Sequence, residues 1–325
     1  MAINLFKPYV SWRARWYALK VLLGTQLAEG EWVRRFEYEF AKKFNLRNVV
    51  ALNSGTSALE LAYELAGIGE GDEVITPVLT CTATNIPLLH RKATIVFADI
   101  DYDLNINIED VKRKITPKTK AIVFVHFGGN NRGLRELLQI AKERNIALIE
   151  DAAQAVGSAF WGQSDYTCVS LQAIKTLTSG DGGFLLCKRD DDHQKAKRLR
   201  WFGYDRDEKQ KRGDTDLKEA GYKYHMNNIS AAIGLGNLRS IDKAFAKRKK
   251  IRDHYNRFYG IKCHAWLCID FKKKGEQHHY RNDKYTIFKQ FKSDCPVMDE
   301  LEHKWRLLPF HHDVSIADAD KAIFS

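Results

Sequence analysis

Between residues 49 and 187, short apolar runs alternate with stretches that have the apolar spacing of helices. The runs are VVAL (49–52), EVITP (73–77), ATIVFADI (93–100), AIVFVHF (121–127), IALIED (146–151), TCVSLQ (167–172) and GFLLC (183–187). Helical spacing follows at 57–66, 84–90, 107–114 and 132–144. Such alternation predicts an α/β fold with a mostly parallel sheet covered by helices on both faces. Ligands of such sheets bind at the carboxyl ends of the strands.

The flanking segments indicate a second, smaller unit. The first 47 residues have helical spacing, with Trp32, Phe36, Phe40 and Phe44 as expected packing residues. Residues 190–200 are predicted to form a charged helix and 203–218 an exposed loop. A long helix over 227–260 should lead into an α+β unit that ends in a helix capped by Ser315. For a chain of 325 residues we therefore predict a large domain over 1–235 and a small domain over 236–325.

The composition is that of an ordinary globular protein, with 44% hydrophobic and 29% charged residues. No apolar run is long enough to cross a bilayer, and the first residues lack the apolar segment of a signal peptide, so we expect a cytoplasmic protein without a membrane partner. The net charge of +11 fits a solvated basic surface, or attraction for an anionic small substrate such as a nucleotide sugar. No nucleic-acid-binding motif is present, so we expect no nucleic-acid partner.

The cysteines and histidines predict neither a disulfide framework nor a metal site. The six cysteines are scattered without a C-x-x-C pair, so most are expected to be buried thiols in a reducing compartment. The histidine pairs at 278–279 and 311–312 have no convincing metal-ligand spacing, so we expect no bound metal.

Three segments place reactive groups at predicted strand ends. Lys175 lies in SLQAIKTLTSGDGG, Asp151 ends the run in IALIEDAAQAVGS, and Gly55 and Thr56 open a helix in VVALNSGTSALELAYELAG. A lysine amine can bind an aldehyde cofactor covalently, a carboxylate can keep a pyridine nitrogen protonated, and a helix start favours a phosphate. Together these are the parts of a pyridoxal 5'-phosphate (PLP) site.

Each residue also has an ordinary structural interpretation. Lys175 could be a surface lysine, and Asp151 could cap a helix that begins at Ala152, with Gln154 completing a capping box. A Ser-Gly-Thr sequence before a helix is common, and Ser170, a further candidate for the phosphate, could be an ordinary strand serine.

The motifs NSGTSAL, IEDAAQAVGS and SLQAIKTLTSGDGG, in this order and spacing, resemble the DegT/DnrJ/EryC1/StrS family. Its members are PLP-dependent sugar aminotransferases of fold type I, the fold of aspartate aminotransferase. The blocks GDEVITP, FADID, GYKYHMNNISAAIGL and LPFHHDVSIADADKAI extend the resemblance over nearly the whole chain. The chain is most similar to members that act on nucleotide-linked 4-keto-6-deoxyhexoses, such as perosamine synthases.

The resemblance implies a role for each site residue. Lys175 matches the lysine that binds PLP covalently, Asp151 the partner of the pyridine nitrogen and Gln154 the residue beside the ring, whereas the phosphate contacts match Gly55, Thr56 and Ser170. It also implies L-glutamate as amino donor with 2-oxoglutarate as product, pyridoxamine 5'-phosphate as the form that carries the amino group, a homodimer with shared sites, and a role in surface polysaccharide biosynthesis.

The chain departs from the family pattern at three places. Cys81 stands where many members carry an aromatic residue that stacks on the cofactor ring. Lys223 stands where many have an asparagine that reaches the neighbouring subunit's phosphate. The segments 285–290 and 291–300 nearly abut where the family usually has a further helix and strand, so the small domain is expected to be shortened.

Two alternatives and one open assignment remain at this point. A PLP-binding protein with reduced catalysis would fit the shortened small domain. A related PLP-dependent sugar 3-dehydratase is disfavoured because those members carry histidine at the position of Lys175. For the carboxylate of the amino donor, Arg200 and Arg206 are the candidates.

Overall fold

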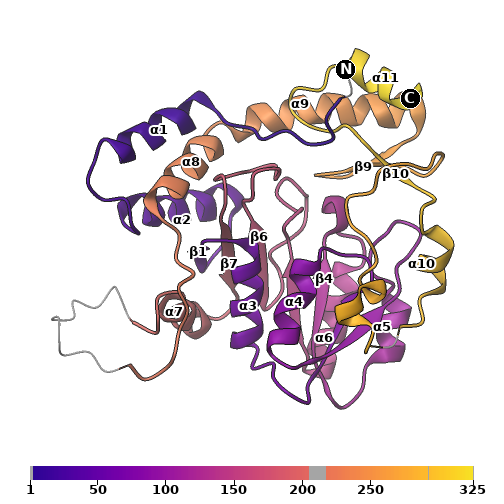
Figure 1. Ribbon diagram of the computed structural model, residues 1–325, viewed down its shortest axis with the longest axis horizontal. Coiled ribbons are helices and arrows are strands. Elements are labelled where there is room, and N and C mark those ends of the chain that lie inside the picture. The colour runs from indigo at the N-terminus through magenta and orange to yellow at the C-terminus, as the bar shows by residue number, and fades with distance from the viewer. Residues whose placement is uncertain (1–2, 205–216, 292, 325) are drawn as a thin grey trace.

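A computed structural model describes residues 3–204, 217–291 and 293–324 (Figure 1). Its centre is a seven-stranded sheet in the order β1-β7-β6-β5-β4-β2-β3. The strands are β1 (Val49–Leu52), β2 (Glu73–Pro77), β3 (Thr94–Ala98), β4 (Thr119–Val125), β5 (Ala147–Asp151), β6 (Tyr166–Ser170) and β7 (Gly183–Cys187). β7 runs antiparallel to β1 and β6, and the other neighbouring pairs are parallel. The predicted α/β class and mostly parallel sheet are confirmed.

Helices cover both faces of the sheet. Apolar residues of α3 (Gly55–Leu65), α4 (Thr82–His90) and α7 (Asp190–Leu199) share a core with one face. The other face packs against α2 (Glu31–Phe44) and α8 (Asn228–Leu238) around β1 and β7, and against α5 (Ile108–Lys114) and α6 (Leu134–Arg144) around β4. Because most strand residues are buried, the strands read as continuous apolar runs in the sequence.

The predicted long helix over 227–260 is interrupted. α8 ends at Leu238, α9 covers Ile241–His254, and a π-helical turn follows over Tyr255–Tyr259. The break separates two packing environments. α8 packs closely on α1 (Trp12–Leu22), where a Cβ on Gly236 would meet the Cα of Ala14 at 2.4 Å. α9 instead enters a separate core.

That separate core belongs to the small C-terminal unit. β10 (Arg306–Leu308), β9 (Cys268–Asp270) and β8 (Lys262–Cys263) form an antiparallel sheet that packs with α9 and with α11 (Ile316–Phe324). As predicted, the hydroxyl of Ser315 caps α11 by accepting from the N–H of Asp318 (3.1 Å).

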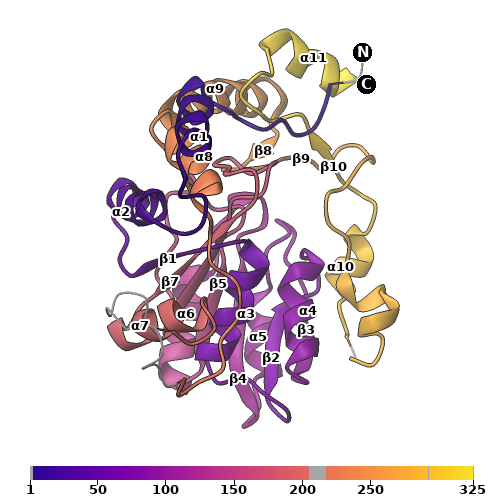
Figure 2. The ribbon, with the colours of Figure 1, turned by 60° about the vertical axis from the view of Figure 1, so that its left-hand side comes forward.

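The chain between β9 and β10 returns to the large domain. It forms two 3-10 turns, Asn282–Lys284 and Thr286–Phe288, and α10 (Pro296–Leu301), and its apolar residues join the core under α3 and α4. Figure 2 shows α10 beside the end of the sheet that carries α4 and β3. The domain boundary at residue 235 stays a prediction, and α8 crosses it.

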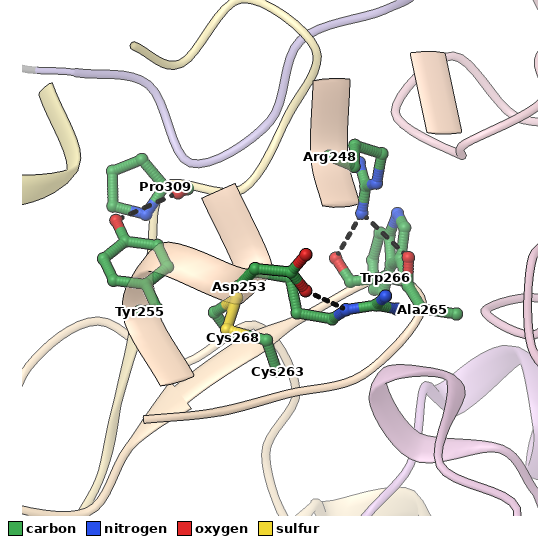
Figure 3. The surroundings of a disulfide bond; sticks show 9 residues. Arg248, Asp253, Tyr255, Cys263, Ala265, Trp266, Cys268 and Pro309 are labelled. Carbon is green, nitrogen blue, oxygen red and sulfur yellow. Dashed lines mark hydrogen bonds and ion pairs between the residues drawn. A yellow bond between two sulfur atoms is a disulfide. The ribbon is translucent and has the colours of Figure 1, made fainter. Parts of the chain in front are cut away.

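The cysteine expectation was wrong for one pair. Cys263 and Cys268 form a disulfide (Figure 3). They lie directly opposite each other in the β8–β9 hairpin, which spacing in the sequence does not reveal. Cys168, Cys187 and Cys295 are buried free thiols, as expected, and Cys81 is a partly buried one.

Two searches of the described residues were negative. None of their helices is both long and apolar enough to cross a membrane. Among the same residues, no group of three or more His, Cys, Asp or Glu side chains is arranged to hold a metal ion.

Candidate active site

A cavity of about 420 Å³ opens at the edge of the sheet where β1, β2, β5 and β6 end. Seven predicted site residues line this one cavity, although they come from four separate segments: Gly55, Thr56, Cys81, Asp151, Gln154, Ser170 and Lys175. The parallel strands explain the convergence, because their carboxyl ends meet at the same edge.

Lys175 follows β6 in a turn closed by its own N–H, which donates to the carbonyl of Gln172 (2.9 Å). Its amine lies 4.1 Å from the ring centroid of Trp266. The surrounding protein disfavours a charge there and lowers the pKa of Lys175 to about 8, although the nearby Asp151 and Cys81 act in the opposite direction. A lowered pKa leaves more of the amine neutral near physiological pH, and the neutral amine is the nucleophile.

Asp151, the last residue of β5, is held in place by neighbours. Its carboxylate accepts hydrogen bonds from the hydroxyl of Thr84 (2.8 Å) and from the N–H of Ala153 (3.1 Å). The hydroxyl of Thr80 lies 2.8 Å from that of Thr84 and extends the network. Residues 153–157 form turns, so Asp151 does not cap a helix at Ala152. The carboxylate is therefore fixed at the cavity.

The neighbouring Glu150 points to the other face of the sheet. There its Oε2 lies 2.7 Å from Nε2 of His126, and both side chains are buried. Its oxygens also accept the backbone N–H groups of residues 162, 163 and 164. Burial raises the pKa of Glu150, but the hydrogen bond from His126 and these N–H groups outweigh it and lower the pKa to about 2. A fully bonded, buried carboxylate fixes the end of β5 and thus the position of Asp151.

The first turn of α3 forms a cradle for an anion. Its first backbone N–H groups have no acceptor within the helix, and the helix dipole favours negative charge there. The hydroxyl of Ser54 caps the helix by accepting from the N–H of Ser57 (3.0 Å). A Cβ on Gly55 would meet the Cβ of Ser170 at 2.8 Å, so only glycine lets the helix start approach the end of β6. This brings the cradle and the Ser170 hydroxyl together.

Gln154 joins the cavity wall to a loop of the C-terminal region. Its side-chain oxygen accepts from the N–H of Gly128 (2.6 Å), which leaves its amide nitrogen to donate to Nε2 of His279 (3.1 Å). It therefore does not form the alternative capping box with Asp151.

His278 and His279 also line the cavity, which the sequence analysis did not predict because it considered these residues only as metal ligands. Burial lowers the pKa of His279 well below its usual value. Burial and the charge of Lys175 together lower the pKa of His278 to about 4. Both are therefore neutral near pH 7. Their loop carries no periodic signal that could have placed them.

Two predicted residues do not reach the cavity. Lys223 is exposed, and its carbonyl accepts from the side chain of Asn53 (3.3 Å). Arg200 is buried in ion pairs with Glu29 (2.7 Å) and Glu37 (2.6 Å), so it is not the partner of a donor carboxylate. Arg206 lies outside the described residues.

The residues of the cavity fit PLP by the chemistry of their groups. An amine of lowered pKa, a fixed carboxylate and a helix start with an adjacent hydroxyl surround one space. These groups match the aldehyde, the pyridine nitrogen and the phosphate of that cofactor.

Comparison with known proteins identifies relatives of the same kind. The chain matches the model of the DegT/DnrJ/EryC1/StrS aminotransferase family over residues 13–304. It is 36% identical over 279 residues to the spore coat polysaccharide biosynthesis protein SpsC of Bacillus subtilis (strain 168), covering 77% of this chain and 71% of SpsC. It is 32% identical over 262 residues to the GDP-perosamine synthase of Escherichia coli O157:H7, covering 78% of this chain and 71% of that protein.

A solved structure extends the likeness to the whole fold. The sugar aminotransferase CalS13 from Micromonospora echinospora superposes with a TM-score of 0.88 at 26% identity, covering 99% of this chain and 98% of that one. Fold, cavity and sequence agree, and the chain belongs to the DegT/DnrJ/EryC1/StrS family of PLP-dependent aminotransferases.

Proposed function

We propose that this protein transfers the amino group of L-glutamate to the keto carbon of a nucleotide-linked 4-keto-6-deoxyhexose and releases 2-oxoglutarate. The observation that carries the proposal is the convergence of Lys175, Asp151 and the start of α3 on one cavity in a member of an aminotransferase family. A GDP-perosamine synthase and a spore coat polysaccharide protein among the relatives support a nucleotide-linked sugar as acceptor and a role in surface polysaccharide biosynthesis.

Each residue then has one task. Lys175 would hold PLP covalently and, once free, move a proton to and from the substrate carbon. Asp151 would keep the pyridine nitrogen protonated, with Gln154 and Cys81 beside the ring. The phosphate would lie on Gly55 and Thr56 at the start of α3, next to Ser170. Bound there, PLP supplies an electron sink for the bond that breaks at the substrate carbon.

We further propose a homodimer in which each copy completes the other's site. Lys223 is exposed beside the turn that precedes α3, and it does not line the cavity of its own chain. A point charge there could reach the phosphate of a second copy. The alternative, a self-sufficient monomer, predicts that Lys223→Ala leaves PLP affinity unchanged.

The decisive experiment has two readouts. Borohydride reduction of the PLP-loaded protein should add the cofactor mass to Lys175, and Lys175→Ala should abolish both this label and glutamate-dependent 2-oxoglutarate release. Lys188→Ala, which removes an exposed lysine far from the cavity, is the matched control. An unlabelled Lys175 would refute the proposal. Release measured with UDP-, dTDP- and GDP-linked 4-ketosugars then identifies the acceptor.

A second candidate is a PLP-binding protein with reduced catalysis. It is favoured by the segment 282–301, whose described residues (282–291 and 293–301) form only short 3-10 turns and the six-residue helix α10. This candidate predicts cofactor mass on Lys175 but no change of the PLP absorbance when glutamate is added. Conversion of that absorbance by glutamate would exclude it.

A further inference from the structure

The outer face of α1 carries a continuous apolar strip. Trp12, Trp16, Leu19 and Leu23 follow one another at intervals of four, three and four residues, so they share one side of the helix. Trp12 is 71% exposed and Leu23 78%, whereas Trp16, Leu19 and Leu22 are 43–57% exposed. Single exposed apolar residues are normal, but a contiguous strip of this size marks an interaction surface.

Contacts of the inner face of α1 hold the helix in one orientation, so the apolar strip stays on the outside. Ala14 and Val21 are buried, and Gly236 of α8 lets the two helices approach closely. Ser11 caps α1 by accepting from the N–H of Ala14 (3.1 Å), and its own N–H donates to the side chain of Asn237 (2.8 Å). The helix is therefore anchored on one side and presents its apolar strip on the other.

Cations flank the strip on both sides. By helical geometry, Arg13 and Lys20 lie along one border and Arg15 along the other, and α1 contains no Asp or Glu. Within the part of the chain that the structure describes, none of the three makes an ion pair with a carboxylate. Instead Arg13 donates to the carbonyl of Arg239 (3.4 Å), and the amine of Lys20 lies 5.4 Å from the ring centroid of Trp16.

A second helix at the same end of the molecule adds positive charge. Figures 1 and 2 both place α1 and α9 at the upper end of the molecule. α9 carries Lys243, Lys247 and Lys250 at helical spacing, and all three are exposed. This end of the protein therefore combines an apolar strip with a concentration of the chain's excess cations.

We propose that α1 docks this protein on the surface of a bilayer that contains anionic lipids. The tryptophans and leucines would enter the boundary between headgroups and acyl chains, while Arg13, Arg15 and Lys20 would meet lipid phosphates. With 11 residues, α1 is too short to span and would lie in the plane of the interface. The expectation of no membrane partner considered spanning segments, which this surface does not require.

The charge pattern favours a bilayer over a contact between the α1 helices of two copies. If α1 packed against the α1 of a second copy across a two-fold axis, Arg13, Arg15 and Lys20 would lie near the same cations of that copy, and α1 has no carboxylate to compensate them. Anionic headgroups supply the missing charge. Tryptophan is also one of the side chains that are enriched at membrane interfaces.

The test is flotation of the full chain with vesicles. Binding to vesicles of phosphatidylcholine mixed with phosphatidylglycerol should be at least about tenfold tighter than binding to phosphatidylcholine alone, and it should weaken as salt is raised. The double variant Trp12→Ser, Trp16→Ser should lose about tenfold or more on the mixed vesicles. Phe258→Ser is the matched control, because Phe258 is 62% exposed but lies outside α1.

A second pair of variants isolates the charge. The triple variant Arg13→Gln, Arg15→Gln, Lys20→Gln should lose the preference for phosphatidylglycerol. A triple variant at Lys118, Lys142 and Lys289, which removes the same charge from exposed sites elsewhere, should keep it. Unchanged thermal melting of each variant shows that a loss is not unfolding.

Three outcomes would overturn the proposal. The parent chain fails to float with the mixed vesicles, or the Trp12/Trp16 variant floats as well as the parent. In the third, sedimentation shows that the parent chain is a dimer and that the Trp12/Trp16 variant is a monomer. The strip would then be an interface between copies. None of these readouts depends on transaminase activity, so failure here leaves the proposed function untouched.

Discussion

At the scale of single residues, the chemistry depends on an amine whose charge is suppressed by its surroundings. Lys175 has a pKa of about 8, because protein around the amine disfavours the charged form. Lysines in water titrate near 10.4. Near neutral pH, the neutral fraction of Lys175 therefore exceeds that of a surface lysine by more than one order of magnitude.

This shift predicts the pH dependence of cofactor capture. The rate at which the cofactor-free protein binds PLP should rise with pH and level off above a midpoint near 8, because only the neutral amine attacks the aldehyde. Asp151→Asn should move the midpoint to lower pH, since the charge of Asp151 raises the pKa of Lys175. Stopped-flow absorbance over a pH series measures both. A midpoint near pH 10 would contradict a pKa of about 8 for Lys175.

Glu150 allows a stability prediction whose sign depends on pH. Its pKa is about 2 in the folded chain and near 4.5 when unfolded, so its ionised form stabilises the fold above pH 4.5. Glu150→Gln should therefore cost about 3 kcal/mol near neutral pH. The difference should shrink as pH falls from 4.5 toward 2.

Urea unfolding of parent and variant measures this difference. Glu109→Gln, which removes an exposed carboxylate paired with Lys112, should change stability by less than about 0.5 kcal/mol. A Glu150→Gln effect as small as that of Glu109→Gln would show that the buried pair with His126 does not hold the end of β5.

At the scale of elements, the site depends on how closely α3 approaches the end of β6. Gly55→Ala places a methyl group 2.8 Å from the Cβ of Ser170, so the first turn of α3 must move away. Because an anion at a helix start is held by directed N–H groups, PLP affinity should fall by about tenfold, with the fold retained.

Equilibrium dialysis with PLP measures this effect. Gly69→Ala is the control, because a Cβ there meets nothing within 4 Å. If Gly55→Ala binds PLP like the parent, the start of α3 is not the phosphate cradle.

At the scale of the whole molecule, the N-terminal segment connects the small unit to the cavity. The ring of Phe6 stacks on Trp266, with the ring centroids 4.9 Å apart. It also packs against His278, with the ring centroids 4.7 Å apart. Trp266 in turn covers the amine of Lys175, and its indole N–H donates to the carbonyl of Ile174 (3.3 Å). A residue near the start of the chain thus supports the part of the cavity wall that contains Lys175 and His278.

Phe6→Ala should therefore lower stability by about 1–2 kcal/mol and change the environment of Trp266. The neighbouring variant Lys7→Ala removes only an exposed ion pair with Asp313 and should cost less than about 1 kcal/mol. Thermal melting followed by tryptophan fluorescence compares the two. Equal effects would mean that Phe6 does not brace the cavity.

The sequence alone determined the sheet, most of its helices and the groups at its rim. Alternating apolar runs placed β1 and β2 at their observed bounds, and the parallel arrangement brought Lys175, Asp151 and Gly55 to one edge. These features follow from local periodicity and from a general rule of parallel sheets, so they need no knowledge of distant contacts.

Tertiary structure alone decided the features that depend on contacts between distant segments. The Cys263–Cys268 disulfide needed the register of a hairpin, and His278 reached the cavity through a loop without periodicity. Arg200 was a candidate partner of the donor carboxylate, but in the structure it pairs with Glu29 and Glu37, which lie more than 160 residues away in the sequence. Such pairings minimise the cost of burying charge across the whole fold, and a linear pattern does not encode them.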